Sequence, residues 1–90
     1  MPLHYNITIV GRVQGVFFRV STQKEAIRLG LTGFVRNESS GNVYVEVEGE
    51  KETIDKLTLW IRLGGPPRGE VNDVEIEDGE MKNFTHFEIR

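Results

Sequence analysis

The sequence predicts an α+β fold of the split βαβ type (βαββαβ), in which a mainly antiparallel sheet carries two helices on one face. Apolar and polar residues alternate in five short stretches, as in half-buried strands, and apolar residues recur at helical spacing in two others. The stretches follow one another as strand, helix, strand, strand, helix and strand, with a short strand appended at the end. We expect residues 1–90 to form a single domain whose helix-free sheet face is half open to solvent.

The strand stretches share an alternation of apolar and polar residues, with turn-forming residues between them. The clearest is the third, where three valines alternate with Tyr44, Glu46 and Glu48. In the last strand, Phe87 and Ile89 are expected to face inward. Because turn-forming residues are dense between the second and third strands, these two strands are expected to form a hairpin. The predicted strands are residues 3–13, 31–37, 43–48, 70–78 and 84–90.

The two helical stretches place apolar or small residues three or four positions apart, so that each helix buries one stripe. The first spans residues 18–29 and ends at Gly30, and Ser21 or Thr22 is expected to cap it or to lie in its first turn. The second spans residues 50–63 and ends at a Gly-Gly-Pro-Pro run. The stripes are Phe18, Thr22, Ala26 and Leu29 in the first helix and Ile54, Leu57 and Ile61 in the second.

Composition and charge exclude several kinds of site. The chain has no cysteine, which excludes disulfides, thiolate nucleophiles and cysteine-ligated metals. Residues 1–40 carry a formal charge of +3 and residues 41–90 a charge of −6, so the basic excess typical of nucleic-acid binders is missing. No stretch has the pattern of a secretion signal or the length of a membrane span. We therefore expect a cytoplasmic protein that binds neither nucleic acid nor membrane.

The stretch Gly-Arg-Val-Gln-Gly-Val-Phe-Phe-Arg at residues 11–19 joins a predicted strand to a predicted helix. Backbone N–H groups at a helix start lack partners within the helix, and the helix dipole favours negative charge there, so this turn could hold a phosphate. Arg19 would add a planar fork of donors. The same stretch could also be an ordinary glycine-containing turn with Arg19 on the surface, and the spacing does not separate the two. It lacks the patterns of nucleotide-binding loops.

Asn37 ends the second predicted strand. Its side chain could simply stabilise the following turn, which is the usual role of an asparagine before a loop. It could also orient a water molecule, because the amide offers a donor and an acceptor without titrating. In the predicted topology the first helix returns the chain to the second strand, so Asn37 could lie near the start of that helix.

Residues 11–19, together with Gly-Phe-Val-Arg-Asn at 33–37 and Gly-Asn-Val at 41–43, closely resemble the two signature motifs of the acylphosphatase family. The resemblance covers nearly the whole chain, and the family fold is the ferredoxin-like split βαβ sandwich predicted above. Carried over residue by residue, it implies that Arg19 binds phosphate and that Asn37 positions the attacking water. The backbone amides that would bind phosphate fall on Gln14, Gly15, Val16, Phe17 and Phe18.

The resemblance implies a metal-independent hydrolase that needs no cofactor. Such an enzyme converts an acyl phosphate to a carboxylate and inorganic phosphate by direct attack of water. We expect a small-molecule acyl phosphate as substrate and a monomeric protein. Three residues depart from the family pattern: Phe17 stands where many members have glycine, Phe34 replaces a commoner tryptophan, and Ser40 replaces a commoner aspartate. None of them alters Arg19 or Asn37.

Two other functions are weighed against this one. One is a carbamoyl-phosphate-handling module, like the acylphosphatase-like part of a larger hydrogenase-maturation protein, although the length of 90 residues favours a stand-alone enzyme. The other is an RNA reader that uses the open sheet face, which should then carry exposed aromatic residues flanked by Lys or Arg. The third strand instead offers Tyr44, Glu46 and Glu48. His4 and His86 have no role in the motifs and are expected to be ordinary surface or sheet residues.

Overall fold

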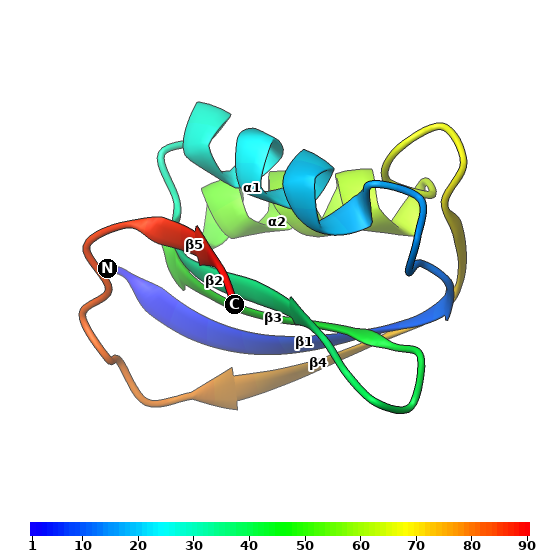
Figure 1. The fold of residues 1–90 in the computed structure, drawn as a ribbon. Coiled ribbons are helices and arrows are strands. Elements are labelled where there is room, and N and C mark those ends of the chain that lie inside the picture. Colours follow the sequence, from blue (N-terminus) through cyan, green and yellow to red (C-terminus); the bar gives the residue numbers. More distant parts are fainter.

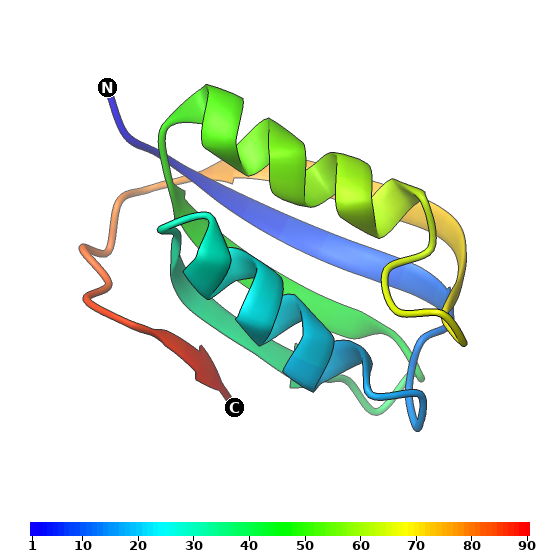
Figure 2. The same ribbon diagram turned by 90° about the horizontal axis from the view of Figure 1, so that it is seen from above.

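A computed structural model describes all 90 residues and shows a five-stranded sheet with two helices on one face (Figures 1 and 2). The order of strands across the sheet is β4-β1-β3-β2-β5. The predicted split βαβ architecture is therefore confirmed. The elements are β1 (Leu3–Arg12), α1 (Phe18–Arg28), β2 (Thr32–Asn37), β3 (Val43–Gly49), α2 (Lys51–Arg62), β4 (Glu70–Gly79) and β5 (Phe87–Ile89).

The sheet is antiparallel except at one edge. β1 and β3 lie at its centre, with Ile7 opposite Val45, and β4 and β2 pair with their outer sides. β5 is added parallel to β2, with Phe87 opposite Gly33. A register shift after Val10 bends the end of β1. This bend lies just before the loop that leads into α1.

The hydrophobic core lies between the sheet and the helices. Alternate residues of β1 and β3 point into it and are fully buried, as the period of two predicts. Both predicted helix stripes face it, although Leu29 at the end of α1 is only half-buried. The central core residues are Ile7, Ile9, Val43, Val45, Val47, Ile54, Leu57 and Ile61, each fully buried.

α1 begins at Phe18, as predicted, but its N-cap is neither of the two candidate residues. Neither Ser21 nor Thr22 caps the helix: the N-cap residue is Phe17, in the left-handed conformation (φ 63°, ψ 24°) and without a side-chain cap. Ser21 lies in the first turn, where its N–H donates to the Phe17 carbonyl at 3.0 Å. Thr22 faces the core and is fully buried, so its hydroxyl cannot reach the helix start.

The last strand is shorter than predicted. β5 comprises three residues, and Phe87 is buried while Ile89 remains 38% exposed. Ile89 lies on the same face of β5 as Phe87 but is only partly covered, because β5 is the edge strand and no further element covers its outer side. Phe84, predicted to begin this strand, instead packs edge-on against Phe34 on the helix-free face, with ring centroids 5.8 Å apart.

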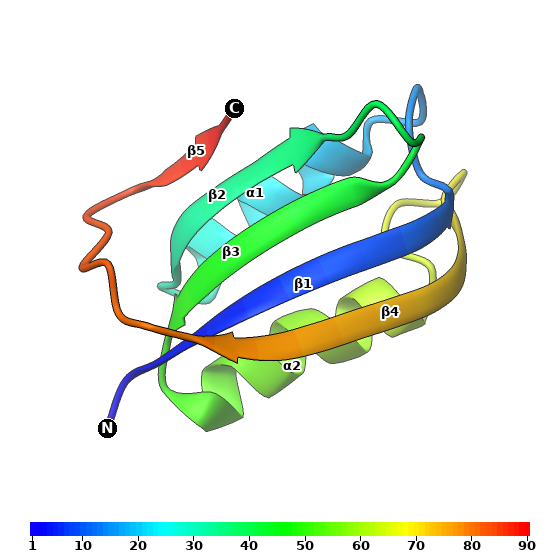
Figure 3. The same cartoon turned by 90° about the horizontal axis from the view of Figure 1, so that it is seen from below.

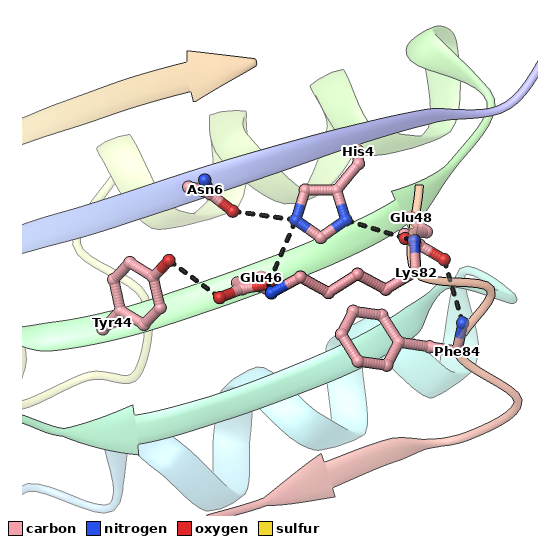
Figure 4. A network of polar contacts seen from close by, with 7 residues as sticks. All are labelled: His4, Asn6, Tyr44, Glu46, Glu48, Lys82 and Phe84. Atoms are coloured by element: carbon pink, nitrogen blue, oxygen red, sulfur yellow. Dashed lines mark hydrogen bonds and ion pairs between the residues drawn. The ribbon is translucent and has the colours of Figure 1, made fainter. Parts of the chain in front are cut away.

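The helix-free face, seen in Figure 3, is more closed than predicted near the start of β1, where the side chains of Figure 4 gather. His4 is a sheet residue of β1, one of the two positions expected for it, and it is only 3% exposed, whereas His86 is exposed. The ring nitrogens of His4 lie 2.7 Å from Glu48 Oε2 and 2.8 Å from Asn6 Oδ1.

The connector between β4 and β5 covers this buried cluster (Figure 4). The backbone N–H groups of Lys82 and Phe84 donate to the carboxylate of Glu48 at 2.6 and 3.0 Å. The Lys82 ammonium donates to Glu46 at 2.8 Å. Tyr44 also donates to Glu46, and burial together with this carboxylate raises the pKa of Tyr44 to about 12.

The aromatic rings of the helix-free face are covered by the chain's own arginines. The Arg90 guanidinium lies 4.3 Å from the ring centre of Phe34, and the Arg36 guanidinium lies 4.7 Å from that of Tyr44. Phe34 itself is only 4% exposed. Base stacking requires an open ring face. The rings on this face therefore lack the exposure that an RNA reader of this type needs.

Candidate active site

The loop between β1 and α1 presents a row of unpaired backbone donors. The N–H groups of Gln14, Gly15, Val16, Phe17 and Phe18 donate no hydrogen bond to another backbone group. Gly15 (φ 75°) and Phe17 (φ 63°) both adopt left-handed conformations, which curl the loop tightly before the helix begins. Successive N–H groups in such a curl form a concave site for an anion. The loop therefore has the form of an anion cradle at a helix N-terminus.

Arg19 and Asn37 line one pocket beside this loop, although 18 positions separate them in the sequence. The pocket has a volume of about 250 Å³, below the usual range for drug-sized ligands and suited to a small anion. Asn37 Oδ1 is buried there and has no hydrogen-bond partner. The remaining lining residues are Val13, Gly15, Phe17, Phe18 and Val20.

The electrostatics of the pocket favour negative charge. Arg19 is half-buried and forms no ion pair with any carboxylate of the chain. The first turn of α1 carries no acidic side chain, so nothing offsets the positive end of the helix dipole. The guanidinium and the helix start together make the pocket an electropositive site.

The side chain of Gln14 has a structural role that the sequence did not reveal. Its amide nitrogen donates to the carbonyl oxygens of Glu38 and Asn42, both at 2.8 Å. These carbonyls belong to the turn that directly follows Asn37. Gln14 therefore ties the loop before α1 to the end of β2. The sequence shows only a glutamine within a glycine-containing turn. It does not show which distant carbonyl groups this side chain would contact.

Phe17 departs from the family pattern at a position whose backbone conformation suits glycine. A positive φ is natural for glycine, which many members have here, and unfavourable for a residue with a bulky side chain. The Phe17 side chain is 76% exposed, so packing recovers little of that cost. Its N–H remains unpaired like those of its neighbours. The phenyl side chain thus leaves the backbone curl intact.

The described chain offers no evident metal centre, since no three His, Asp or Glu side chains gather in an arrangement that could hold an ion. Neither helix has the length and apolar character needed to cross a membrane. The polar groups that meet in the pocket are amides and a guanidinium. Groups of this kind bind an anion and orient water, but none of them is a nucleophile.

Comparison with known proteins assigns the family. A model of the acylphosphatase family matches residues 5–89. The acylphosphatase of Acaryochloris marina is 44% identical over 81 residues, which cover 90% of this chain and 86% of the relative. A solved acylphosphatase structure from Coxiella burnetii superposes with a TM-score of 0.94 at 39% identity, covering 99% of this chain and 93% of that chain.

Part of a larger protein is also similar. The structure of full-length HypF in a phosphate- and nucleotide-bound form superposes with a TM-score of 0.94 at 33% identity. The match covers 100% of this chain and 12% of HypF. The A. marina and C. burnetii acylphosphatases are instead matched over most of their own lengths. The resemblance of the two signature motifs is thereby confirmed, and the chain belongs to the acylphosphatase family of hydrolases.

Proposed function

We propose that this chain hydrolyses acyl phosphates to a carboxylate and inorganic phosphate, without a metal ion and by direct attack of water. The observation that carries the proposal is the meeting of Arg19 and Asn37 in one pocket beside the unpaired amides of residues 14–18. The substrate is a small molecule. All the groups required belong to one chain, so we propose that residues 1–90 act as a single domain and as a monomer.

The amides of Gln14, Gly15, Val16, Phe17 and Phe18 and the guanidinium of Arg19 hold the phosphoryl group. In phosphoryl transfer the transition state spreads negative charge over the three equatorial oxygens. Fixed N–H donors stabilise this charge without reorganising during the reaction. The positive end of α1 adds to the same effect.

Asn37 positions the attacking water. Asn37 lines the pocket, and its side-chain amide offers a donor and an acceptor to a water molecule. The water oxygen forms a bond to phosphorus while the bond between phosphorus and the acyl oxygen breaks. A phosphate oxygen of the substrate takes the proton. The carboxylate is a good leaving group, so no general acid is needed.

The RNA-reader alternative lacks support on the helix-free face. Its aromatic residues lie beneath Arg36 and Arg90. The similarity to part of HypF keeps a carbamoyl-phosphate-handling role as the second candidate. Carbamoyl phosphate is itself an acyl phosphate, so the two candidates share the phosphate site and differ in the acyl group accepted.

One assay tests the proposal. Purified protein is incubated with benzoyl, acetyl or carbamoyl phosphate in the presence of a chelator, and release of inorganic phosphate is followed. We expect hydrolysis of benzoyl and acetyl phosphate, competitive inhibition by inorganic phosphate, and no effect of the chelator. Turnover of carbamoyl phosphate alone would favour the second candidate. Hydrolysis that the chelator abolishes, or no hydrolysis of any of the three, would contradict the proposal.

A further inference from the structure

A second groove opens beside the phosphate pocket. It has a volume of about 470 Å³ and lies between the start of α1 and the loop from α2 to β4, which run side by side in Figure 2. Gly65 in this loop sits so close to the Phe18 ring that a Cβ atom there would lie 2.8 Å from it. The lining residues are Val16, Phe17, Ser21, Pro66, Pro67 and Arg68.

The groove and the phosphate pocket adjoin at Phe17, which lines both of them. In an acyl phosphate a single oxygen joins the phosphorus to the acyl carbon. A phosphoryl group held by the loop amides therefore places its acyl group within a few bond lengths of the pocket's rim. The groove begins at that rim.

The lining of the groove defines the chemistry that it would accept. Val16, Pro66, Pro67 and the Phe17 ring form a mainly apolar wall, and the prolines limit its conformational freedom. Arg68 is exposed and forms no ion pair with any carboxylate of the chain. Its charge is therefore available to a ligand. This combination suits a flat apolar group with a negative charge at its far end.

We propose that this groove is the acyl subsite, and that it favours acyl groups with an apolar body and an anionic substituent that Arg68 binds. The inference rests on the proposed function and adds the class of substrate. The backbone of Phe17 supports it: a bulky residue in the left-handed region is strained, and the exposed ring regains little of this cost by packing within the chain. Contact with a bound acyl group would give the ring the packing that it lacks within the chain.

The test compares three substrates that share the phosphate end: acetyl phosphate, benzoyl phosphate and 4-carboxybenzoyl phosphate. We expect kcat/KM to rise in that order. The variant Phe17→Gly keeps the backbone N–H and removes the ring. It should lower the ratio of kcat/KM for benzoyl over acetyl phosphate by about tenfold, the scale of a lost apolar contact in a pocket.

Arg68→Gln tests the charged end, and Arg62→Gln is the matched control, because Arg62 is exposed on α2 and does not line this groove. Arg68→Gln should lower the ratio of kcat/KM for 4-carboxybenzoyl over benzoyl phosphate by about two- to fivefold, as expected for an exposed ion pair. Added salt should reduce the same ratio in the unmodified protein, and Arg62→Gln should leave it unchanged.

The outcomes separate this inference from the proposed function. Equal kcat/KM values for all three substrates, with neither ratio altered by Phe17→Gly or Arg68→Gln, would overturn the acyl subsite and leave the proposed hydrolysis standing. An equal loss in Arg62→Gln and Arg68→Gln would show a general effect of charge and would also overturn it. Failure to hydrolyse any of the three would overturn both.

Discussion

The side-chain amide of Gln14 donates a hydrogen bond of 2.8 Å to the carbonyl oxygen of Asn42, which joins the loop before α1 to the turn between β2 and β3. A second bond of the same length reaches the Glu38 carbonyl. The first segment carries the proposed phosphate-binding amides, and the second follows Asn37 directly. The two halves of the proposed site are thus held at a fixed separation by one side chain.

Replacing Gln14 by alanine should separate these halves. We expect kcat for benzoyl phosphate to fall about tenfold or more, because a small displacement of water from phosphorus is costly for an in-line reaction. The matched control is Gln23→Ala, which also removes a side-chain bond to a backbone carbonyl, that of Phe87, but at residues that do not line the pocket. Steady-state kinetics should show the loss in Gln14→Ala alone. An equal loss in both variants would contradict the positioning role.

Replacing Arg19 by lysine should abolish most of the activity although the charge is retained. A compact ammonium cannot reproduce the planar fork of a guanidinium. We expect kcat/KM to fall by about two to three orders of magnitude, the typical cost of losing one preorganised donor. The inhibition constant of inorganic phosphate should rise in parallel. Kinetics close to those of the unmodified enzyme would refute a phosphate-binding role for Arg19.

Replacing Asn37 by alanine should affect turnover more than phosphate binding. The proposed role of Asn37 is to hold water, so kcat should fall by about two orders of magnitude or more. The inhibition constant of inorganic phosphate should change little. A rise in that constant as large as in Arg19→Lys would instead assign Asn37 to the phosphate itself.

Acid should remove part of the stability that Glu48 provides. Burial alone would raise the pKa of Glu48, but the hydrogen bonds from the Lys82 and Phe84 N–H groups and from His4 outweigh it and hold the pKa below its ordinary value. A carboxyl group whose pKa is lower in the folded state stabilises the fold above its unfolded pKa, and this contribution is lost as the pH falls through the folded pKa. The melting temperature should therefore fall below about pH 4.

Two variants isolate this contribution. Glu48→Gln should destabilise the protein near neutral pH by about 1.5–3 kcal/mol, because it removes a buried carboxylate that accepts the Lys82 and Phe84 N–H groups, and should melt with a weaker dependence on acid. Glu75→Gln, on the exposed face of β4, is the control and should behave like the unmodified protein. Thermal unfolding followed by circular dichroism from pH 7 to pH 2 checks both. An unchanged acid dependence in Glu48→Gln would contradict the assignment.

Phe17→Gly should stabilise the fold, even though it alters the proposed acyl subsite. Glycine adopts the left-handed conformation without strain, and the lost side chain is mostly exposed. The greater freedom of glycine in the unfolded chain offsets part of the gain. We expect a net increase of about 0.5–1 kcal/mol in the free energy of unfolding, measured by denaturant titration. A clear loss of stability would mean that the ring packs on the protein.

The features that could be predicted are those encoded locally. The strand at β3 with its valines in the core and the helical spacing of α2 depend on neighbouring residues, and both predictions are confirmed. The expected open face of β3 is not found, because Glu46 and Glu48 are buried. The burial of His4 depends instead on Glu48, 44 positions away, and on a connector that folds over both residues. A polar residue on a predicted solvent face gives no sign of such a cover.

In the proposed site, too, the features encoded locally could be predicted and those that depend on distant residues could not. The loop from 11 to 19 could be predicted because a strand, a helix and the glycines in between are adjacent in the chain. The conformation of Phe17 could not, because propensity disfavours a positive φ for phenylalanine and the surrounding fold imposes it. The bonds of the Gln14 side chain span 24 and 28 positions and depend on the finished hairpin.

The position of β4 at one edge of the sheet has a consequence for how copies of the chain meet. An edge strand presents unpaired backbone groups that can pair with another molecule and start aggregation. Five of the ten residues of β4 are acidic and none is basic, so two such edges repel each other on approach. The opposite edge, β5, has only three residues and offers a short template. The excess acid of residues 41–90 thus keeps crowded molecules from joining into continuous sheets.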